Sequence, residues 1–392
     1  MGREGLLTSA WYAALFFAFG AHLPYWPVWL RDWGLSQGEI GSYLGGALVV
    51  RVVASIALPL LADRFTIRRA MIAAAGLAAA AIFVAHLFIE ARPVLFAATL
   101  ATAVATAPLI PLGEALGIRA SARHGFAYAH ARAIGSIAFL VMNVGLGVLL
   151  ARFGTGVVLW AVALNLALVA ALGAVHPGGG APPGAMTDRA SLREAAGLLR
   201  QPVFLTFIGA AGIGQASHAV YYAYGSLTWL AQGVPAEVIG LLWATGVVAE
   251  IALLLGPGRR LIARIGPARA LAAAAAAGVV RWALMSLEPA QALLWPVQAL
   301  HALTFAVGHL GAIAFVAAAI PPRLQATAQG IYGGGISGLA IALATLLAGW
   351  ISEAHGIASA YWLAAAMSAM ALMAALRLAL VWDGGPLDPA QT

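Results

Sequence analysis

HPGGGAPPG, from His176 to Gly184, divides this chain into two halves, because proline and glycine at this density form neither helix nor strand. Six long apolar segments precede this stretch and six follow it. We place them, each to within a few residues, at 8–30, 37–61, 70–89, 93–117, 126–150, 155–175, 203–231, 236–256, 267–287, 290–319, 324–350 and 356–381. A helix needs about 20 apolar residues to cross a bilayer. The pattern therefore predicts an all-α membrane protein with twelve transmembrane helices in two pseudo-symmetric six-helix bundles.

The composition leaves little room for a soluble domain. Hydrophobic residues make up 62% of the chain and charged residues 9%, against roughly 25% charged residues in soluble domains. We expect an N-terminal bundle at 1–175, a cytoplasmic linker at 176–201 and a C-terminal bundle at 202–392. The end of the linker, MTDRASLREAAGLLR, is amphipathic and could lie along a membrane surface.

All 21 basic residues are arginine, and their distribution predicts the orientation of the chain. With the N-terminus inside, fifteen lie in loops and tails on that side, whereas three, Arg31, Arg92 and Arg152, lie on the other side. Positively charged loops stay in the cytoplasm, so we expect both termini to be cytoplasmic in a protein of the inner membrane. The net charge of +7 then follows from topology and requires no nucleic-acid partner.

Missing residue types exclude several kinds of chemistry. The chain has no lysine, so it lacks both the P-loop amine that holds ATP phosphates and the amine that forms a Schiff base. It has no cysteine, which excludes disulfides and thiolate sites. No nucleophile–base pair or metal-ligand motif is readable. We therefore expect no enzyme activity, no metal site and no cofactor.

Charged side chains inside the spans are the candidate functional residues, because a charge in the bilayer normally faces a partner or a water-filled cavity. Glu114 and Arg132 lie on consecutive antiparallel helices, where they can meet; the alternative is a purely structural ion pair. Glu250 and His301 could carry a proton, with a structural histidine as the alternative. The other groups at such depths are Arg51, Arg281, His22, His218 and His309. For Arg51, His22 and His309 the sequence leaves functional and structural roles open.

GQASHAVYYAYGSLTW, residues 214–229, surrounds more than half of the seventh span with polar and aromatic side chains. His218 and Tyr222 share one face, and Tyr221 lies on the adjoining face. An aromatic belt is the alternative explanation, but belts lie at helix ends and His218 is in mid-span. We therefore expect this span to form a cavity wall.

Spans two and eight echo each other. Ile40-Gly41 precedes Arg51, and Ile239-Gly240 precedes Glu250 at the same spacing. Two halves built on one plan are typical of transporters that bind their substrate at the interface between the repeats. A chance match between helices rich in Ala, Val and Gly is the alternative.

These residues resemble a known family over nearly the whole chain. LPLLADRFTIRR is similar to the gating-loop signature of the major facilitator superfamily: Asp63, Arg64 and Arg68 fit, whereas Pro59 and Thr66 replace glycines. The segments LPYWPVWL, YAHARAIGS, HAVYYAYGSLTW, GVVAE and VVRW resemble the phenylpropionate permease group, relatives of the galactoside–proton symporter. The resemblance implies the twelve-helix facilitator fold and secondary active transport.

The resemblance also implies roles for single residues. Residues that match substrate-binding or proton-coupling positions of the galactoside permease are Glu114, Arg132, Glu250, Arg281 and His301. Thr304 stands where that permease has a coupling carboxylate. If coupling exists here, Glu250 and His301 must carry it.

The resulting hypothesis is proton-coupled uptake of a small organic acid, an aromatic monocarboxylate such as a phenylpropionate. Arg132 or Arg281 would hold the carboxylate, and His218 would join them in the substrate site. The side chains that could flank an aromatic ring are Tyr221, Tyr222 and Trp243. Alternatives are a sugar or nucleoside symporter, and a non-transporting membrane receptor on the same fold. We expect a monomer in the lipid bilayer.

Overall fold

The computed structural model describes residues 2–179 and 192–387, and every regular element among them is a helix. Twelve helical segments of this part of the chain are long and apolar enough to cross a membrane: Arg3–Asp32, Gln37–Arg64, Arg68–Phe88, Arg92–His124, Tyr128–Phe153, Gly156–Ala174, Pro202–Ala231, Ala236–Leu255, Pro267–Ser286, Gln291–Ala319, Pro322–His355 and Ile357–Val381. The all-α class and the twelve predicted spans are thereby confirmed.

The chain forms two compact units. Unit 1 comprises Met1–Pro183 and Gly225–Ala244, and unit 2 comprises Gly184–Tyr224 and Thr245–Thr392. Segment 225–244, which the sequence assigns to the C-terminal bundle, thus groups with the N-terminal residues. The physical reason is close packing: a Cβ on Gly240 would lie 2.5 Å from the carbonyl oxygen of Asn143, and the Tyr25 hydroxyl donates to that same oxygen at 2.8 Å.

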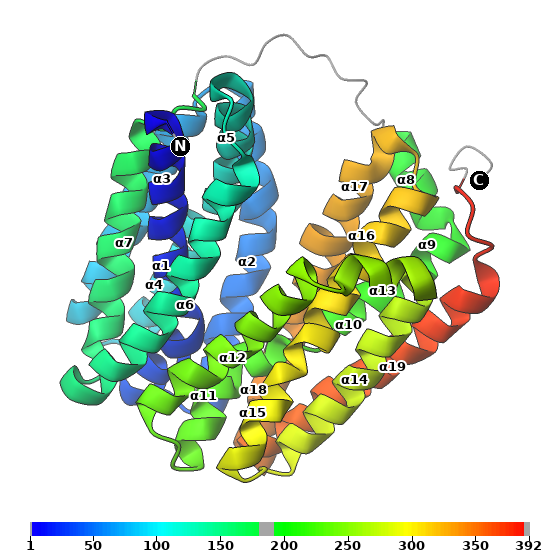
Figure 1. Cartoon of the computed structure of the whole chain (residues 1–392). Coiled ribbons are helices and arrows are strands. Elements are labelled where there is room, and N and C mark those ends of the chain that lie inside the picture. The colour runs from blue at the N-terminus through cyan, green and yellow to red at the C-terminus, as the bar shows by residue number, and fades with distance from the viewer. Residues whose placement is uncertain (1, 180–191, 388–392) are drawn as a thin grey trace. The chain divides into compact units, whose positions relative to one another are not determined.

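Unit 1 is built from helices that its small residues allow to approach closely. Its elements are α1 (Arg3–Asp32), α2 (Gln37–Arg64), α3 (Arg68–Ala85), the 3-10 turn η1 (His86–Phe88), α4 (Arg92–Thr106), α5 (Leu109–His124), α6 (Tyr128–Phe153) and α7 (Gly156–Ala174). In this unit α1 runs beside α6 and α7 (Figure 1). A Cβ on Gly20 would lie 2.7 Å from the Phe139 carbonyl oxygen, so the α1–α6 contact depends on a bare backbone.

Gly113 sets the distance between α5 and α1. A Cβ at this position would lie 1.9 Å from the ring of Trp11, which is fully buried. We expect Gly113→Ala to lower the free energy of unfolding by about 1–3 kcal/mol, because the ring cannot move without displacing its neighbours. Thermal unfolding of the purified protein measures this. Gly145→Ala, where a Cβ meets nothing within 4 Å, is the control and should leave the melting temperature unchanged or slightly higher.

Unit 2 holds most of the remaining elements. They are α8 (Leu192–Arg200), α9 (Pro202–Phe207), η2 (Ile208–Ile213), α10 (Gly214–Ala216), α11 (Ala219–Ala231), α12 (Ala236–Leu255), α13 (Gly258–Ile265), α14 (Pro267–Ser286), α15 (Gln291–Ala299), η3 (Ala302–Val307), α16 (Gly308–Ala319), η4 (Pro322–Leu324), α17 (Gln325–Gln329), η5 (Gly330–Ser337), α18 (Gly338–His355), η6 (Ile357–Ser359) and α19 (Ala360–Val381). The later part of α11 and the first part of α12 belong to unit 1. In unit 2, α14 runs beside α19 (Figure 1). Helix α8 covers the end of the predicted amphipathic stretch, whose residues 186–191 lie outside the described residues.

Three segments of unit 2, η2, η3 and η5, are π-helical. Such wide turns inside α-helices are rare and are frequent at functional sites. Segment η2 ends shortly before His218, and η3 begins directly after His301. His218 and His301, the two histidines of the predicted site, therefore each lie close to a π-helical segment.

Candidate functional site

The structure brings Glu114 on α5 and Arg132 on α6 together. The Nε of Arg132 donates to the Glu114 carboxylate at 3.3 Å, and both side chains are partly exposed. Gly125 makes this approach possible: its φ of +69° ends α5 in the left-handed conformation, so α6 can return alongside. The pair is thus close enough to be either a structural ion pair or half of a binding site.

Aromatic rings of α1 lie against Arg132. Its guanidinium carbon is 4.2 Å from the centre of the Phe16 ring and 5.7 Å from that of Tyr12. The Tyr12 hydroxyl lies 3.2 Å from that of Tyr128. We call Tyr12, Phe16, Glu114, Tyr128 and Arg132 the Arg132 cluster. It combines a cation, an anion and ring faces in one unit.

The predicted gating loop lies between α2 and α3. Asp63 and Arg68 form an ion pair, and the Arg64 guanidinium lies over the Phe65 ring at 5.8 Å. Thr66, where the family signature has a glycine, has a φ of +55°, a conformation that β-branched residues rarely adopt. At Thr66 the backbone therefore adopts a left-handed conformation that favours glycine, although the residue is a threonine. The gating role of this loop stays a prediction.

Arg281 on α14 is the centre of a buried polar network in unit 2, and its side chain has no exposed surface. It donates to His301 Nδ1, to the Thr304 hydroxyl and to Gln298 Oε1, each at 3.0 Å. Ring faces cover the guanidinium on two sides, Tyr221 at 4.9 Å and Trp282 at 4.5 Å. We call these residues, together with Glu250, the Arg281 cluster.

The contacts of His301 determine where its proton lies. An arginine N–H can only donate, so His301 Nδ1 accepts from Arg281 and the ring proton is on Nε2. His301 Nε2 lies 3.4 Å from the Glu250 carboxylate, towards which it therefore donates. Glu250 on α12 is thus connected to Arg281 through the histidine ring, and the opposite charges of unit 2 share one network.

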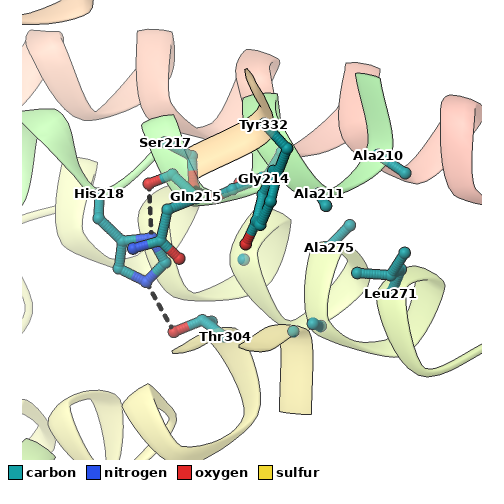
Figure 2. A pocket seen from close by; sticks show the side chains of 14 residues that line it. Ala210, Ala211, Gly214, Gln215, Ser217, His218, Leu271, Ala275, Thr304 and Tyr332 are labelled. Atoms are coloured by element: carbon teal, nitrogen blue, oxygen red, sulfur yellow. Dashed lines mark hydrogen bonds between the residues drawn. The ribbon is translucent and has the colours of Figure 1, made fainter. Parts of the chain in front are cut away.

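His218 extends this network into a small cavity, shown in Figure 2. Its Nε2 lies 3.2 Å from the Thr304 hydroxyl, and its Nδ1 lies 3.2 Å from the Gln215 carbonyl oxygen. The cavity has a volume of about 20 Å³, and among small and apolar residues its lining includes Gln215, Ser217, His218, Thr304, Tyr332 and Ser368. That space is sufficient for one water molecule. The first part of the seventh span, up to His218, therefore borders this cavity, and the role of the span as a substrate-cavity wall stays a prediction.

The remaining predicted site residues divide between the units. Tyr222 stacks on His218, with ring centres 5.9 Å apart, and belongs to unit 2. Trp243 belongs to unit 1, where its indole N–H donates to Ser226 at 2.9 Å. His309, left open by the sequence, stacks against Phe305 at 6.1 Å. The role of Trp243 beside Tyr221 and Tyr222 in the substrate site stays a prediction.

Several residues of the clusters were not predicted. Phe16 and Trp282 are apolar positions in apolar helices, so their contact with a guanidinium has no signal in the sequence. Gln298 and Thr304 lie three residues on either side of His301 in the sequence, but their bonds to Arg281 depend on the packing of α14 against α15 and η3. Among the described residues, no group of three His, Asp or Glu could hold a metal ion.

Comparison with known proteins agrees with this architecture. The model of the MFS_1 like family matches residues 7–363. The chain belongs to the MFS_1-like family. This MFS_1-like protein is also 31% identical over 369 residues to the "Probable 3-phenylpropionic acid transporter" of Escherichia coli K12, with 92% of this chain and 94% of the relative covered. It is 26% identical over 355 residues to the maltose permease of Geobacillus stearothermophilus, covering 89% and 88%.

Solved structures show the same fold for this MFS_1-like protein. The nucleoside transporter NupG matches with a TM-score of 0.81 at 14% identity, covering 97% of this chain and all of that one. The peptide transporter PepTSo matches with a TM-score of 0.72 at 12% identity, covering 97% of both chains. The protein is therefore a multi-pass membrane transporter of the major facilitator type.

Proposed function

We propose that this transporter takes up an aromatic monocarboxylate of the phenylpropionate class together with a proton. The observation that carries the proposal is that each unit presents an arginine against aromatic rings inside its spans, Arg132 over Phe16 and Arg281 over Trp282. A ligand that combines a carboxylate with a ring can bond to such a guanidinium and pack on such a ring. The 31% identical relative, named for 3-phenylpropionic acid, supports this ligand class.

The proton is carried by Glu250 in this proposal. A second proton on His301 would have to enter at Nδ1, where it would face the guanidinium N–H that already donates there. Glu250 has no such obstacle, and His301 orients it through Nε2. Bringing an anion into a negatively charged cell costs about 2.3 kcal/mol per 100 mV, and an accompanying proton cancels this cost.

The setting of the transporter is part of the proposal. The arginine distribution supports an inner-membrane protein with both termini in the cytoplasm. With this orientation the gating loop around Asp63 and Arg68 faces the cytoplasm. We further propose that the protein acts as a monomer, since one chain contains both units.

A sugar or nucleoside is the second candidate ligand. The Glu114–Arg132 pair offers an acceptor and a donor side by side, which suits hydroxyl groups. The 26% identical relative is named a maltose permease. This alternative requires no net charge on the ligand.

Counterflow in proteoliposomes tests the proposal. Purified protein is reconstituted with internal 3-phenylpropionate, and uptake of the labelled acid is competed with phenylpropionate, maltose or uridine. We expect competition by phenylpropionate alone, and accumulation of the acid under an imposed inward proton gradient. Competition by maltose or uridine alone supports the second candidate. Binding without any accumulation indicates a receptor rather than a transporter.

A further inference from the structure

Arg51 is a cation in the middle of α2 whose charge no carboxylate balances within the described part of the chain. Its guanidinium carbon lies 5.8 Å from the centre of the Phe19 ring of α1. It forms none of the ion pairs found among the described residues, which join other arginines or His301 to acids. A cation in this position is expensive unless an anion or water meets it.

Arg51 lies on the face of α2 opposite the exposed apolar stripe of this helix. Helix α2 exposes an apolar stripe formed by Val49, Val53, Ile56 and Leu60, each at least 36% exposed. These residues follow one another at helical spacing and form a single face. Arg51 lies two residues beyond Val49, about 200° around the helix. Its side chain is partly buried and points to the side where α1 supplies Phe19.

The neighbours of Arg51 cannot neutralise it. His22 on α1 interacts electrostatically with Arg51, but a histidine is neutral or positive and never an anion. The His22 ring is also occupied by packing, because it stacks on Trp26 with centres 5.7 Å apart. Glu114, the acid among the mid-span residues of unit 1, is already paired with Arg132. Among the mid-span charges of unit 1 that the structure describes, Arg51 is therefore left without a carboxylate partner.

A continuous aromatic surface joins this charge to the Arg132 cluster. Phe16 and Phe19 are one turn apart on α1, with ring centres 6.0 Å apart at an edge-to-face angle of 75°. The Arg132 guanidinium lies over the Phe16 ring, and the Arg51 guanidinium lies over the Phe19 ring. The surface thus offers two rings to an aromatic ligand and, at one end, a guanidinium without a counterion.

We infer that Arg51 binds the carboxylate of the transported aromatic acid, whose ring packs beside Phe16 and Phe19. This assignment rests on the proposed function and adds to it the residue that selects an anion over a neutral analogue. Arg132 keeps Glu114 as its counterion, so it positions the aromatic surface, whereas Arg51 gains its counterion only when the substrate arrives. Substrate binding then neutralises the mid-span charge of Arg51, which favours acids over sugars.

The test compares the acid with its neutral amide. Affinities of the purified full-length protein for 3-phenylpropionate and 3-phenylpropionamide are measured by isothermal titration calorimetry at pH 7.5, where the acid is ionised. We expect Arg51→Gln to weaken acid binding about 10- to 100-fold, as for loss of a hydrogen bond to a charged group, and to leave amide binding unchanged. Arg152→Gln, an exposed arginine at the end of α6, should change neither.

A second variant keeps the test decisive if Arg51→Gln does not fold. The chain has no cysteine, so Arg51→Cys introduces a single thiol that can be labelled with a cationic methanethiosulfonate. We expect 3-phenylpropionate to slow this labelling and the attached cation to restore the preference for acid over amide. Arg152→Cys should be labelled at the same rate with and without the acid.

The outcomes separate the inference from the proposed function. If the wild-type protein does not bind the acid at all, the proposed function fails. If the wild type binds it but Arg51→Gln keeps the same preference for acid over amide, or the acid does not protect Arg51→Cys, the assignment of Arg51 is overturned and the proposed function stands.

Discussion

Glu250→Gln is expected to abolish uphill accumulation of substrate while leaving exchange intact. Glutamine has nearly the shape of protonated glutamate, so its side-chain oxygen can still accept from His301 Nε2, which lies 3.4 Å from the carboxylate in the wild type. It cannot take up or release a proton, however. A gradient of one pH unit should drive about tenfold accumulation in the wild type at one proton per substrate, since tenfold corresponds to about 1.4 kcal/mol. The variant should reach a ratio near one in the same proteoliposomes.

The matched control for this prediction is Glu237→Gln. Glu237 is exposed in the first turn of the same helix, α12, so its neutralisation should alter neither accumulation nor counterflow. Normal accumulation by Glu250→Gln would remove Glu250 from the proton path. Loss of counterflow together with accumulation would instead assign Glu250 to substrate binding.

Arg281→Met should strongly reduce both stability and transport. Methionine preserves much of the side-chain length but removes the hydrogen bonds of Arg281 to His301, Thr304 and Gln298, so each of these residues loses a donor. Removing one partner from a buried charged network costs about 3–5 kcal/mol. We therefore expect a clear fall in the melting temperature of the purified protein and uptake close to background.

Three further variants separate structural from functional effects at Arg281. Arg269→Met, an exposed arginine in the first turn of the same helix, is the control and should melt like the wild type. Arg281→Lys keeps the positive charge but lacks the planar guanidinium group with its several N–H donors. Compared with Arg281→Met, it should therefore restore the melting temperature more fully than it restores uptake. Glu250→Gln combined with Arg281→Met should be more stable than Arg281→Met alone, because the double variant removes the negative charge of the network as well as the positive one. An Arg281→Met protein that melts and transports like the control contradicts this role.

The number of spans could be predicted from the sequence because each span is a continuous stretch of the chain. Each span is an apolar run, and the same minimum length applies to all of them because they cross the same bilayer core. Internal irregularities were missed. The fourth span breaks between α4 and α5, where Pro108 cannot donate a backbone hydrogen bond. The grouping of 225–244 with unit 1 depends on the contact of Gly240 with Asn143, residues far apart in the sequence.

The candidate site was predictable where its members are close in the chain. Glu114 and Arg132 were expected to meet because a short loop joins their helices, and they form the ion pair that geometry allows. Their roles in transport stay predictions. The rings of Phe16 and Phe19 were not predicted, because apolar residues in a transmembrane helix give no sign of whether they face lipid, a neighbouring helix or a guanidinium.

Composition and hydrophobic length alone established a twelve-span membrane protein that contains no lysine or cysteine chemistry, because the cost of transferring a side chain into lipid depends on its own polarity. Whether a buried charge has a counterion depends on distances between side chains of different helices, which no linear pattern contains. The folded structure therefore distinguishes Arg132 and Arg281 from Arg51. Arg132 and Arg281 bond to partners within their own units, whereas no carboxylate among the described residues pairs with Arg51.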